Sequence, residues 1–388
     1  IDLPYRKLLG ELGDLNQRRV EVEMTTAPPT MVMSEMATPR QATVLKRGEY
    51  DQPGETVSPN VPHSLPPLPD DVPTNRLGLA QWLIEPNNPL TARVAVNRWW
   101  QLYFGTGIVE TVEDFGSQGT WPTHPELLDW LAIEFVASDW NVKAMQKRIV
   151  MSATYRQSSH VTTALLHRDP KNQLLARGPR FRLPAEAIRD NALFVSGLLG
   201  QRLGGPSVRP YQPAGLWRDV SVSQSVIYKQ DLGQNLYRRS MYTFWKRTCP
   251  PPSLSTFDAP DRETCQIRRM RTNTPLQALV LMNDPTYVEA ARMLAERVML
   301  EGGESGESKV NHAYRLVLAR RSRPAEQRAM LSLLEDARTR FRAETEKASA
   351  LITIGDSARN AKLDPVELAA WTTVTSVLLC LDETISKE

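Results

Sequence analysis

Cysteine is scarce in this chain: its 388 residues include only Cys249, Cys265 and Cys380. Their spacing matches no zinc-site pattern, and the CxxCH haem-attachment motif is absent. The low, odd number excludes a disulfide framework. At most one bridge could form, with Cys249 and Cys265 the only pair close in sequence, and three unpaired thiols are the expected state.

Long apolar runs and several functional motifs are also missing. No stretch of 18 apolar residues exists, so no transmembrane segment is expected, and no signal peptide is recognisable. Because the first residue is Ile1 rather than Met, we expect a fragment of a longer or processed chain. Walker A, GxGxxG, G-x-S-x-G and HExxH motifs are absent and the five histidines are scattered, so the sequence predicts neither a nucleotide enzyme nor a metal site.

The charge of the chain is nearly balanced. Its formal net charge of +3 comes from 47 basic and 44 acidic residues, and this mixture does not indicate a nucleic-acid partner. Apolar residues make up 41% of the chain, which is enough to bury a sizeable core.

Helical periodicity dominates the chain after residue 76. Gly105 is placed to end a helix over 91–104, and the sequence THPE at 123–126 has the form of a capping box before a helix over 125–138. Pro285, Pro324 and Pro365 stand at first-turn positions of later helices. Short β-rich segments occur at 30–33, 42–47 and 240–246. The predicted fold is mainly α: a large multi-helix globular domain with a small N-terminal β-containing appendage and a short internal β element.

The composition along the chain predicts four parts. Residues 1–26 are the end of an upstream helix, with a helix expected over 4–20, and residues 27–75 are a Pro-rich extended or β appendage. Residues 76–301 form the main helical core, and residues 302–388 form a C-terminal helical subdomain after a Gly- and Ser-bearing link.

Several phrases of the sequence resemble one known family, the planctomycete-type PSD family (domain of unknown function 1553). They are NPLTARVAVNRWWQLYFGTGIVETVEDFG (88–116), THPELLDWLA (123–132), SATYRQSS (152–159), LPAEAIRDNALFVSGLL (183–199), RRMRTNTPLQALVLMNDP (268–285) and LLCLDETISKE (378–388). The similarity covers about residues 40–388.

The resemblance implies a setting rather than a reaction. Proteins of this kind sit at the C-terminal end of large exported proteins that carry an upstream cytochrome c-like domain. An exported location, periplasmic or at the cell surface, is therefore expected, with that domain or a partner protein as neighbour. The segment itself is expected to bind no cofactor; haem c, if present, would belong to the upstream domain.

Three groups of residues are candidates for a functional site. The first comprises Arg98, Trp99, Trp100, Asp114, Trp121 and His124. Arg98 lies in an apolar helix, where a buried guanidinium needs a carboxylate partner, and Asp114 is the nearest candidate. Asp114 and His124 are the catalytic candidates, while Arg98, Trp99 and Trp121 would suit a saccharide or ring-shaped ligand. Alternatively, the pair is structural and the tryptophans are core.

The other two groups follow later in the chain. The sequence YRQSSH at 155–160 offers hydroxyls and an imidazole, although a capped helix end with a polar loop explains it as well. Arg268, Arg269 and Arg271 precede a helix, where an Arg cluster suits a sulfate, phosphate or carboxylate, or serves an internal ion-pair network.

These observations favour an exported binding or scaffolding module of a cytochrome c-linked assembly, with a saccharide or anionic ligand or a partner domain on its Arg- and aromatic-lined surface. The alternative is an enzyme acting on polysaccharide or sulfated saccharide, with its site around Arg98, Asp114 and His124. A second alternative is a haem-shielding electron-transfer partner.

Overall fold

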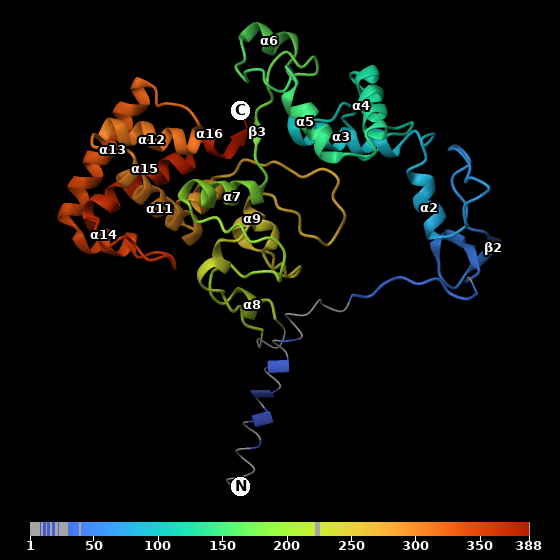
Figure 1. Cartoon of the computed structure of the whole chain (residues 1–388), viewed down its shortest axis with the longest axis horizontal. Coiled ribbons are helices and arrows are strands. Elements are labelled where there is room, and N and C mark those ends of the chain that lie inside the picture. The colour runs from blue at the N-terminus through green and yellow to red at the C-terminus, as the bar shows by residue number, and fades with distance from the viewer. Residues whose placement is uncertain are drawn as a thin grey trace. The chain divides into compact units, whose positions relative to one another are not determined.

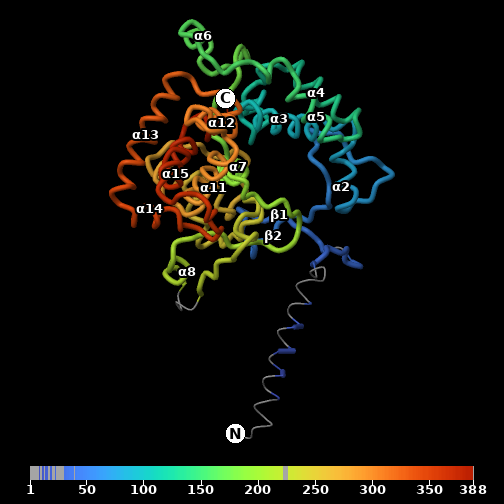
Figure 2. The backbone as a smooth tube through the Cα atoms, turned by 60° about the vertical axis from the view of Figure 1, so that its left-hand side comes forward, coloured from blue at the N-terminus to red at the C-terminus, as the bar shows by residue number. Residues whose placement is uncertain are grey.

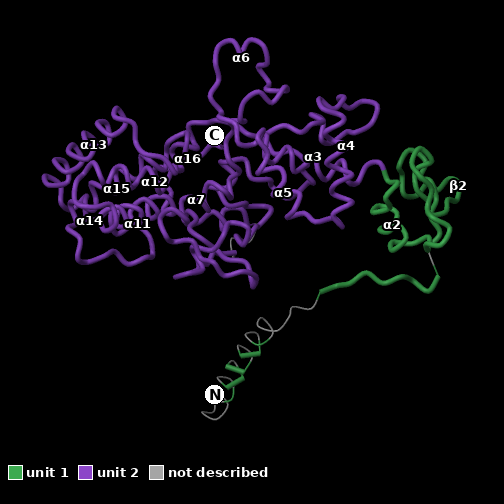
Figure 3. The backbone as a smooth tube through the Cα atoms, turned by 45° about the horizontal axis from the view of Figure 1, so that its top comes forward, with its two compact units in different colours: residues 1–88 green, residues 89–388 purple. Residues whose placement is uncertain are grey.

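The structure is a computed structural model that describes residues 30–387, apart from Pro39 and residues 222–225, and scattered positions among residues 1–29. The described residues form 15 α-helices and two pairs of short antiparallel strands, which confirms the predicted mainly α fold. In this part of the chain no helix has both the length and the apolar character that a membrane crossing requires. The chain divides into two compact units, Ile1–Asn88 and Pro89–Glu388 (Figure 3).

The first unit carries the predicted β-containing appendage. Strand β1 (Ala42–Leu45) pairs antiparallel with β2 (Pro53–Val57), and α2 (Arg76–Leu83) follows. Trp82 of α2 is buried and donates its indole N–H to the Pro66 carbonyl at 2.7 Å, which ties the Pro-rich segment to the helix. The strand predicted over residues 30–33 is wrong, because these residues are irregular rather than part of a strand. The helix predicted over 4–20 lies largely outside the described residues.

The second unit contains two apolar cores, of which the smaller is built by three helices. They are α3 (Thr91–Phe104), α4 (Pro125–Ala137) and α5 (Val142–Met151). Val96, Trp100 and Phe104 follow one another at four-residue spacing, so they share one face of α3 and are all buried. The Trp100 and Phe104 rings stack with centroids 4.1 Å apart. Gly105 ends α3 with φ of +84°, as predicted.

The start of α4 differs in detail from the predicted capping box. The helix begins at Pro125, but its N-cap residue His124 makes no side-chain capping bond. Thr123 is drawn instead toward the loop after α3: its backbone N–H donates to the Ile108 carbonyl at 2.9 Å and its hydroxyl donates to the same oxygen at 3.3 Å. Tertiary bonds to the preceding loop have therefore replaced the local cap.

The larger core is a bundle around α15 (Figures 1 and 2). Its helices are α7 (Ala185–Ser196), α11 (Pro285–Glu301), α12 (Gly306–Leu318), α13 (Pro324–Ala343), α14 (Thr345–Ile352) and α15 (Pro365–Cys380). The prolines predicted at first-turn positions begin α11, α13 and α15. Small side chains bring α11 and α15 together, and the Thr375 hydroxyl donates to the Ala291 carbonyl at 2.7 Å across this contact. The link at 302–308 joins α11 to α12 within this core.

The remaining elements are short. They are α6 (Thr163–Arg168), α8 (Leu216–Asp219), α9 (Pro252–Thr256), α10 (Pro275–Asn283), α16 (Asp382–Ile385) and the 3-10 turns η1 (Lys46–Gly48), η2 (Gly233–Tyr237) and η3 (Ser240–Tyr242). A strand pair that was not predicted joins β3 (Phe181–Arg182) to β4 (Ser386–Lys387).

The strand predicted over residues 240–246 is wrong. The segment begins as the turn η3 and continues with single bridges, of which Thr243 makes one with Val208. The buried guanidinium of Arg189 in α7 holds the turn just before this segment by donating to the carbonyls of Leu236 and Arg238 and to the Ser240 hydroxyl. Within the segment, the Tyr242 carbonyl and the Phe244 N–H both bond to Val208, so the pairing stays a single bridge.

A buried ionic network lies between α11 and the loop that precedes α15. Glu289 is fully buried, and its carboxylate accepts hydrogen bonds from the hydroxyls of Tyr211 and Tyr237, both at 2.8 Å. The same carboxylate accepts the backbone N–H and the hydroxyl of Ser357 at 2.7 and 2.6 Å. Arg292, one helical turn later, donates to Glu296 and to Ser357. The network fastens the 355–360 loop to the bundle.

The three cysteines are free thiols, as expected. Cys265 is exposed, and Cys249 and Cys380 are half-buried.

Candidate functional site

The first predicted group does not come together as one site. Arg98 is exposed rather than buried, and the expected ion pair with Asp114 is absent from the described residues. Asp114 turns back on its own loop, where its carboxylate accepts the Gly116 N–H at 2.7 Å. Trp121 is 90% exposed, and His124 is half-buried with its Nδ1 3.0 Å from the Thr123 hydroxyl oxygen.

The buried polar residue of α3 is Asn97, the neighbour of Arg98. Its side-chain amide accepts the Val109 N–H at 2.9 Å and donates to the Val109 carbonyl at 3.1 Å, and the residue has no exposed surface. A Cβ atom on Gly107 would lie 2.7 Å from Asn97 Nδ2, so the Gly-Thr-Gly turn leaves room for this bridge. One helical position, about 100° of rotation, separates the buried amide from the exposed guanidinium.

The tryptophans of the first group have mixed roles. Trp99 is half-buried and packs edge-on against Phe135 at 4.8 Å, and Trp100 belongs to the small core. Their packing follows the core alternative considered for this group, whereas the 90% exposure of Trp121 does not.

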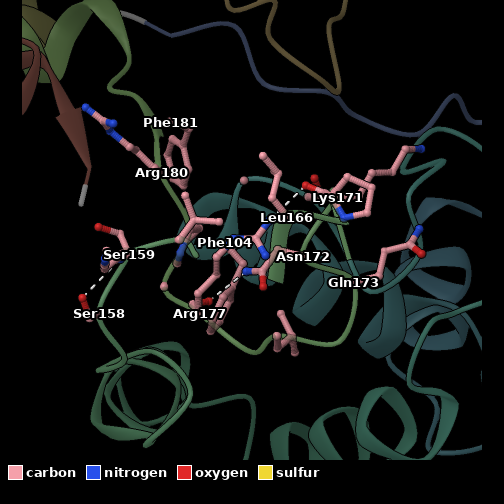
Figure 4. A pocket seen from close by; sticks show the side chains of 18 of the residues that line it. Phe104, Ser158, Ser159, Leu166, Lys171, Asn172, Gln173, Arg177, Arg180 and Phe181 are labelled. Atoms are coloured by element: carbon pink, nitrogen blue, oxygen red, sulfur yellow. Dashed lines mark hydrogen bonds between the residues drawn. The ribbon is translucent and has the colours of Figure 1, made fainter. Parts of the chain in front are cut away.

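The second and third groups both reach a large cleft within the second unit. The cleft has a volume of about 1010 Å³ and lies where the small core meets the segment that connects it to α7 (Figure 4). Gly105–Gly107 forms part of its wall, as do residues 158–161 and most of residues 170–181; Arg271, Arg323 and Glu383 also line it. Of the first group only Trp100 reaches it, although Thr123 and Glu110 beside that group also line it.

Ser158, Ser159 and His160 line the cleft without forming a nucleophile–base pair. The Ser158 hydroxyl oxygen accepts the backbone N–H of His160 at 3.2 Å, which is a local turn, and the His160 side chain is exposed. The Ser158 carbonyl accepts the Gly178 N–H at 2.8 Å. A Cβ on Gly178 would lie 2.5 Å from the Gln157 carbonyl oxygen, so a glycine is needed for the two walls to approach so closely.

The Arg cluster divides between two roles. Arg268 lies 4.0 Å from Glu113, and Arg269 pairs with Glu186 at 2.6 Å, so both take part in ion pairs. Arg271 turns into the cleft, where its guanidinium donates to the Gly105 carbonyl at 3.4 Å and stands over the Phe181 ring at 4.2 Å. A Cβ on Gly105 would lie 2.9 Å from the Phe181 ring, so the glycine that ends α3 also makes this contact sterically feasible.

Cationic side chains outnumber carboxylates in the cleft. Its lining includes Lys171, Arg177, Arg180, Arg271 and Arg323 against Glu110 and Glu383. Both carboxylates already have partners: Glu110 accepts from Lys171 at 3.1 Å, and Glu383 pairs with Arg320 at 2.7 Å. Arg180 pairs with Asp382 at the rim.

Arg177 and Arg271 have no carboxylate partner among the described residues. Arg177 donates from one Nη atom to the Asp169 carbonyl and from the other to the Pro170 carbonyl, both at 3.0 Å. The Asp169 carboxylate is occupied by the N–H groups of Gln173 and Leu174. Burial lowers the pKa of Arg271, and the nearby positive charge of Arg182 lowers it further. Arg177 is held by two backbone carbonyls, whereas the exposed Arg271 is held by one long hydrogen bond and the Phe181 ring. The positive charge of neither is neutralised by a carboxylate among the described residues.

The aromatic residues of the cleft support its walls rather than offering open faces. Trp100 and Phe104 are buried against each other. The Phe181 ring carries Arg271 at 4.2 Å and Lys387 at 5.8 Å. The polarity of the cleft therefore comes from its cations, hydroxyls and amides.

The sequence reasoning missed the segment that supplies most of these cations. The stretch DPKNQLLARGPRFR (169–182) contributes Lys171, Arg177 and Arg180. Its signal was a run of basic residues around Pro and Gly, which indicates a loop held close to other backbone.

Within the described part of the chain, no three His, Cys, Asp or Glu side chains lie together as ligands for a metal ion. Comparison with known proteins yields one match: the family described as PSD1, proteins of unknown function (DUF1553), over residues 75–334, more than half of the chain. No curated protein and no solved structure matches the chain significantly.

Proposed function

The chain belongs to the PSD1 family, whose function is unknown, and we propose that its Pro89–Glu388 unit is a binding module that holds an anionic ligand in the cleft around Arg177 and Arg271. The observation that carries this proposal is the excess of cations in the cleft. Five cationic side chains and two carboxylates line the cleft. Lys171, Arg180 and Arg323 have carboxylate partners in Glu110, Asp382 and Glu326, so Arg177 and Arg271 are the lining cations without one among the described residues.

The two guanidiniums without a carboxylate suit an anion for a physical reason. Taking a cation partly out of water without a counterion is unfavourable, so a bound carboxylate, sulfate or phosphate would supply missing interaction energy. Hydrogen bonds between Arg and such anions are short, charge-assisted and often bidentate. Because both side chains are already held by backbone carbonyls, binding would cost little conformational entropy.

The family resemblance suggests where the module would act. The module would act in an exported, cytochrome c-linked assembly, next to an upstream cytochrome c-like domain that would hold any haem c. An anionic surface of such a partner would meet the same guanidiniums as a small ligand.

Isothermal titration calorimetry with inorganic sulfate and with a heparin-derived hexasaccharide tests the binding. At least one probe should bind the wild-type protein, and the exchanges Arg177→Met and Arg271→Met should each weaken that binding about 10-fold, the low end for a hydrogen bond to a charged group. Arg342→Met is the matched control. Arg342 is exposed on the last turn of α13, whereas the cleft-lining Arg323 lies at the other end of that helix.

Binding that neither cleft exchange weakens would contradict the proposal, as would binding that the control weakens equally. Arg177 also holds its own loop, so its variant is first compared with the wild type by circular dichroism. Lys171→Met provides a second cleft variant for the hexasaccharide probe alone, at a side chain that is 66% exposed and supports no buried group.

A further inference from the structure

We infer that the ligand of this cleft is a linear saccharide that carries several anionic groups together with free hydroxyls. This inference rests on the proposed function, since it specifies the chemistry of the anion. Three features of the cleft support it. The cleft is large and its cations lie at separate points; a hydrogen-bond acceptor among these cations has no donor; and the faces of its aromatic rings are covered by other side chains.

The size of the cleft exceeds what a single small anion requires. Its volume of about 1010 Å³ lies at the upper end of the roughly 300–1,000 Å³ typical of sites for drug-sized ligands. Lys171 and Arg180 lie on opposite sides of the cleft, with Arg177 between them (Figure 4). A chain with charges at intervals could contact more of these cations than one sulfate or phosphate group.

The outer cations are available to a ligand at small cost. The side chains of Lys171 and Glu110 are 66% and 37% exposed, and those of Arg180 and Asp382 are 54% and 64% exposed. Exposed ion pairs of this kind contribute about 0–1 kcal/mol, because water screens them and the long side chains lose freedom. An anionic group of a ligand can therefore replace either carboxylate.

An acceptor in the middle of this basic cleft lacks a donor. The Asn172 side chain donates from Nδ2 to the Arg177 carbonyl at 2.8 Å, which fixes the orientation of its amide. Its Oδ1 is buried and accepts no hydrogen bond from the described residues. A fully ionised anion such as sulfate has no proton to donate to this oxygen. A ligand with hydroxyl groups beside its anionic groups would satisfy both the cations and, once a small shift of the Asn172 side chain opens this oxygen to the cleft, the acceptor.

The surrounding neutral groups are consistent with a hydroxylated ligand. Ser158, Ser159 and Gln173 line the same cleft, as do Thr106 and Thr123. Hydroxyls and amides both donate and accept hydrogen bonds, which matches the hydroxyl groups of a sugar ring.

The covered aromatic rings argue against a single-stranded nucleic acid as the polyanion. Proteins that bind single strands stack bases on open aromatic faces. Here Trp100 and Phe104 are buried against each other, and Phe181 carries Arg271 and Lys387. The whole chain has a net charge of only +3, whereas nucleic-acid-binding domains are commonly strongly basic.

A series of ligands tests the inference by calorimetry. The probes are inorganic sulfate, heparin-derived di-, tetra- and hexasaccharides, the desulfated hexasaccharide and a single-stranded RNA hexamer. We expect affinity to rise with saccharide length, to fall at least 10-fold on desulfation, and to depend more steeply on salt for the longer chains, because more ion pairs form.

A matched pair of variants locates the effect. Lys171→Met should weaken hexasaccharide binding about 5-fold and leave sulfate binding unchanged, since a single anion would sit at Arg177 or Arg271. Lys347→Met is the control, because Lys347 is 71% exposed and pairs with Glu344 at 2.8 Å, much as Lys171 pairs with Glu110.

The outcomes separate the inference from the proposal on which it rests. Sulfate that binds as tightly as the hexasaccharide, with loss in the Arg177 and Arg271 variants, would overturn the inference and leave the anion-binding proposal standing. RNA that binds as tightly as the sulfated chain would also overturn the saccharide assignment. If none of the probes binds, both fail.

Discussion

The exchange Glu289→Gln should be among the most destabilising isosteric changes in the larger core. Glu289 has no exposed surface, and its carboxylate accepts four hydrogen bonds, from Tyr211, from Tyr237 and twice from Ser357. Arg292, only 1% exposed, lies 3.7 Å from the same carboxylate. The amide of glutamine has nearly the same shape, so the exchange removes charge and acceptor capacity without opening a cavity.

The magnitude follows from these contacts. A hydrogen bond to a charged group contributes about 1.5–3 kcal/mol and a neutral one about 0.5–1.5 kcal/mol, so each of the four bonds weakens by about 1 kcal/mol. The total of about 4 kcal/mol agrees with the roughly 3–5 kcal/mol observed when one partner of a buried ion pair is removed. Arg292 keeps Glu296, 3.0 Å away, which prevents a larger loss. Because folded domains are stable by only about 5–15 kcal/mol, the change is easily measured.

Urea unfolding followed by tryptophan fluorescence is a suitable assay, because Trp371 is fully buried in the same core. The urea concentration at the midpoint of unfolding should fall strongly, and the m-value should not change. Glu335→Gln is the matched control: Glu335 pairs with Arg338 at 2.5 Å on a helix surface but is 64% exposed, so its loss should cost less than about 1 kcal/mol. Equal effects of the two exchanges would refute the view that the buried network fastens the 355–360 loop.

Three further predictions follow from the same structure. Gly355→Ala should destabilise the protein by several kcal/mol, because φ is +100° and the new Cβ would lie 2.2 Å from the Glu289 carboxyl carbon. Gly204→Ala is the control: its φ is +73° and no atom lies near the new Cβ, so it should cost only about 1 kcal/mol in the same urea assay. Burial and the hydrogen bond to Glu289 raise the pKa of Tyr237 to about 12. The folded state therefore favours the neutral form of Tyr237. Its contribution to the free energy of unfolding should be fully present below about pH 10 and decline by up to about 1.4 kcal/mol per pH unit as the pH rises toward 12. Tyr237→Phe should reduce that slope, and an unchanged slope would contradict the assignment. Burial raises the pKa of Cys380 to about 11. Iodoacetamide at pH 8 should therefore modify the exposed Cys265 more than about 10-fold faster than Cys380. Mass spectrometry should show this difference in the folded protein and its loss in urea.

Local signals in the sequence account for most of the helices. Gly105 ends α3, and Pro285, Pro324 and Pro365 begin their helices as predicted, because capping and first-turn preferences act within a few residues. The family resemblance also followed from the sequence, and the matched region confirms it.

Local patterns were less informative where a distant side chain competed with the backbone. Arg189 takes up the carbonyls of Leu236 and Arg238 just before residue 240, and the segment 240–246 itself makes a turn and isolated bridges rather than the strand its alternating pattern predicted. On α3, apolar neighbours suggested a buried Arg98, but the loop after the helix returned to bond with Asn97 instead. Which of two adjacent polar residues faces inward depends on where that loop packs.

The sequence by itself determined a mainly α-helical chain, its family and the presence of arginines before α10. Only the tertiary structure decided which of them face a ligand. The cleft joins Gly105 to Arg271, 166 residues apart, and its rim joins Arg180 to Asp382, 202 residues apart. Contacts of this length depend on how the two cores of the second unit pack, whereas helix periodicity and capping depend only on near neighbours. The cleft of cations is therefore a product of packing, and its residues carry no mark of that shared role in the linear sequence.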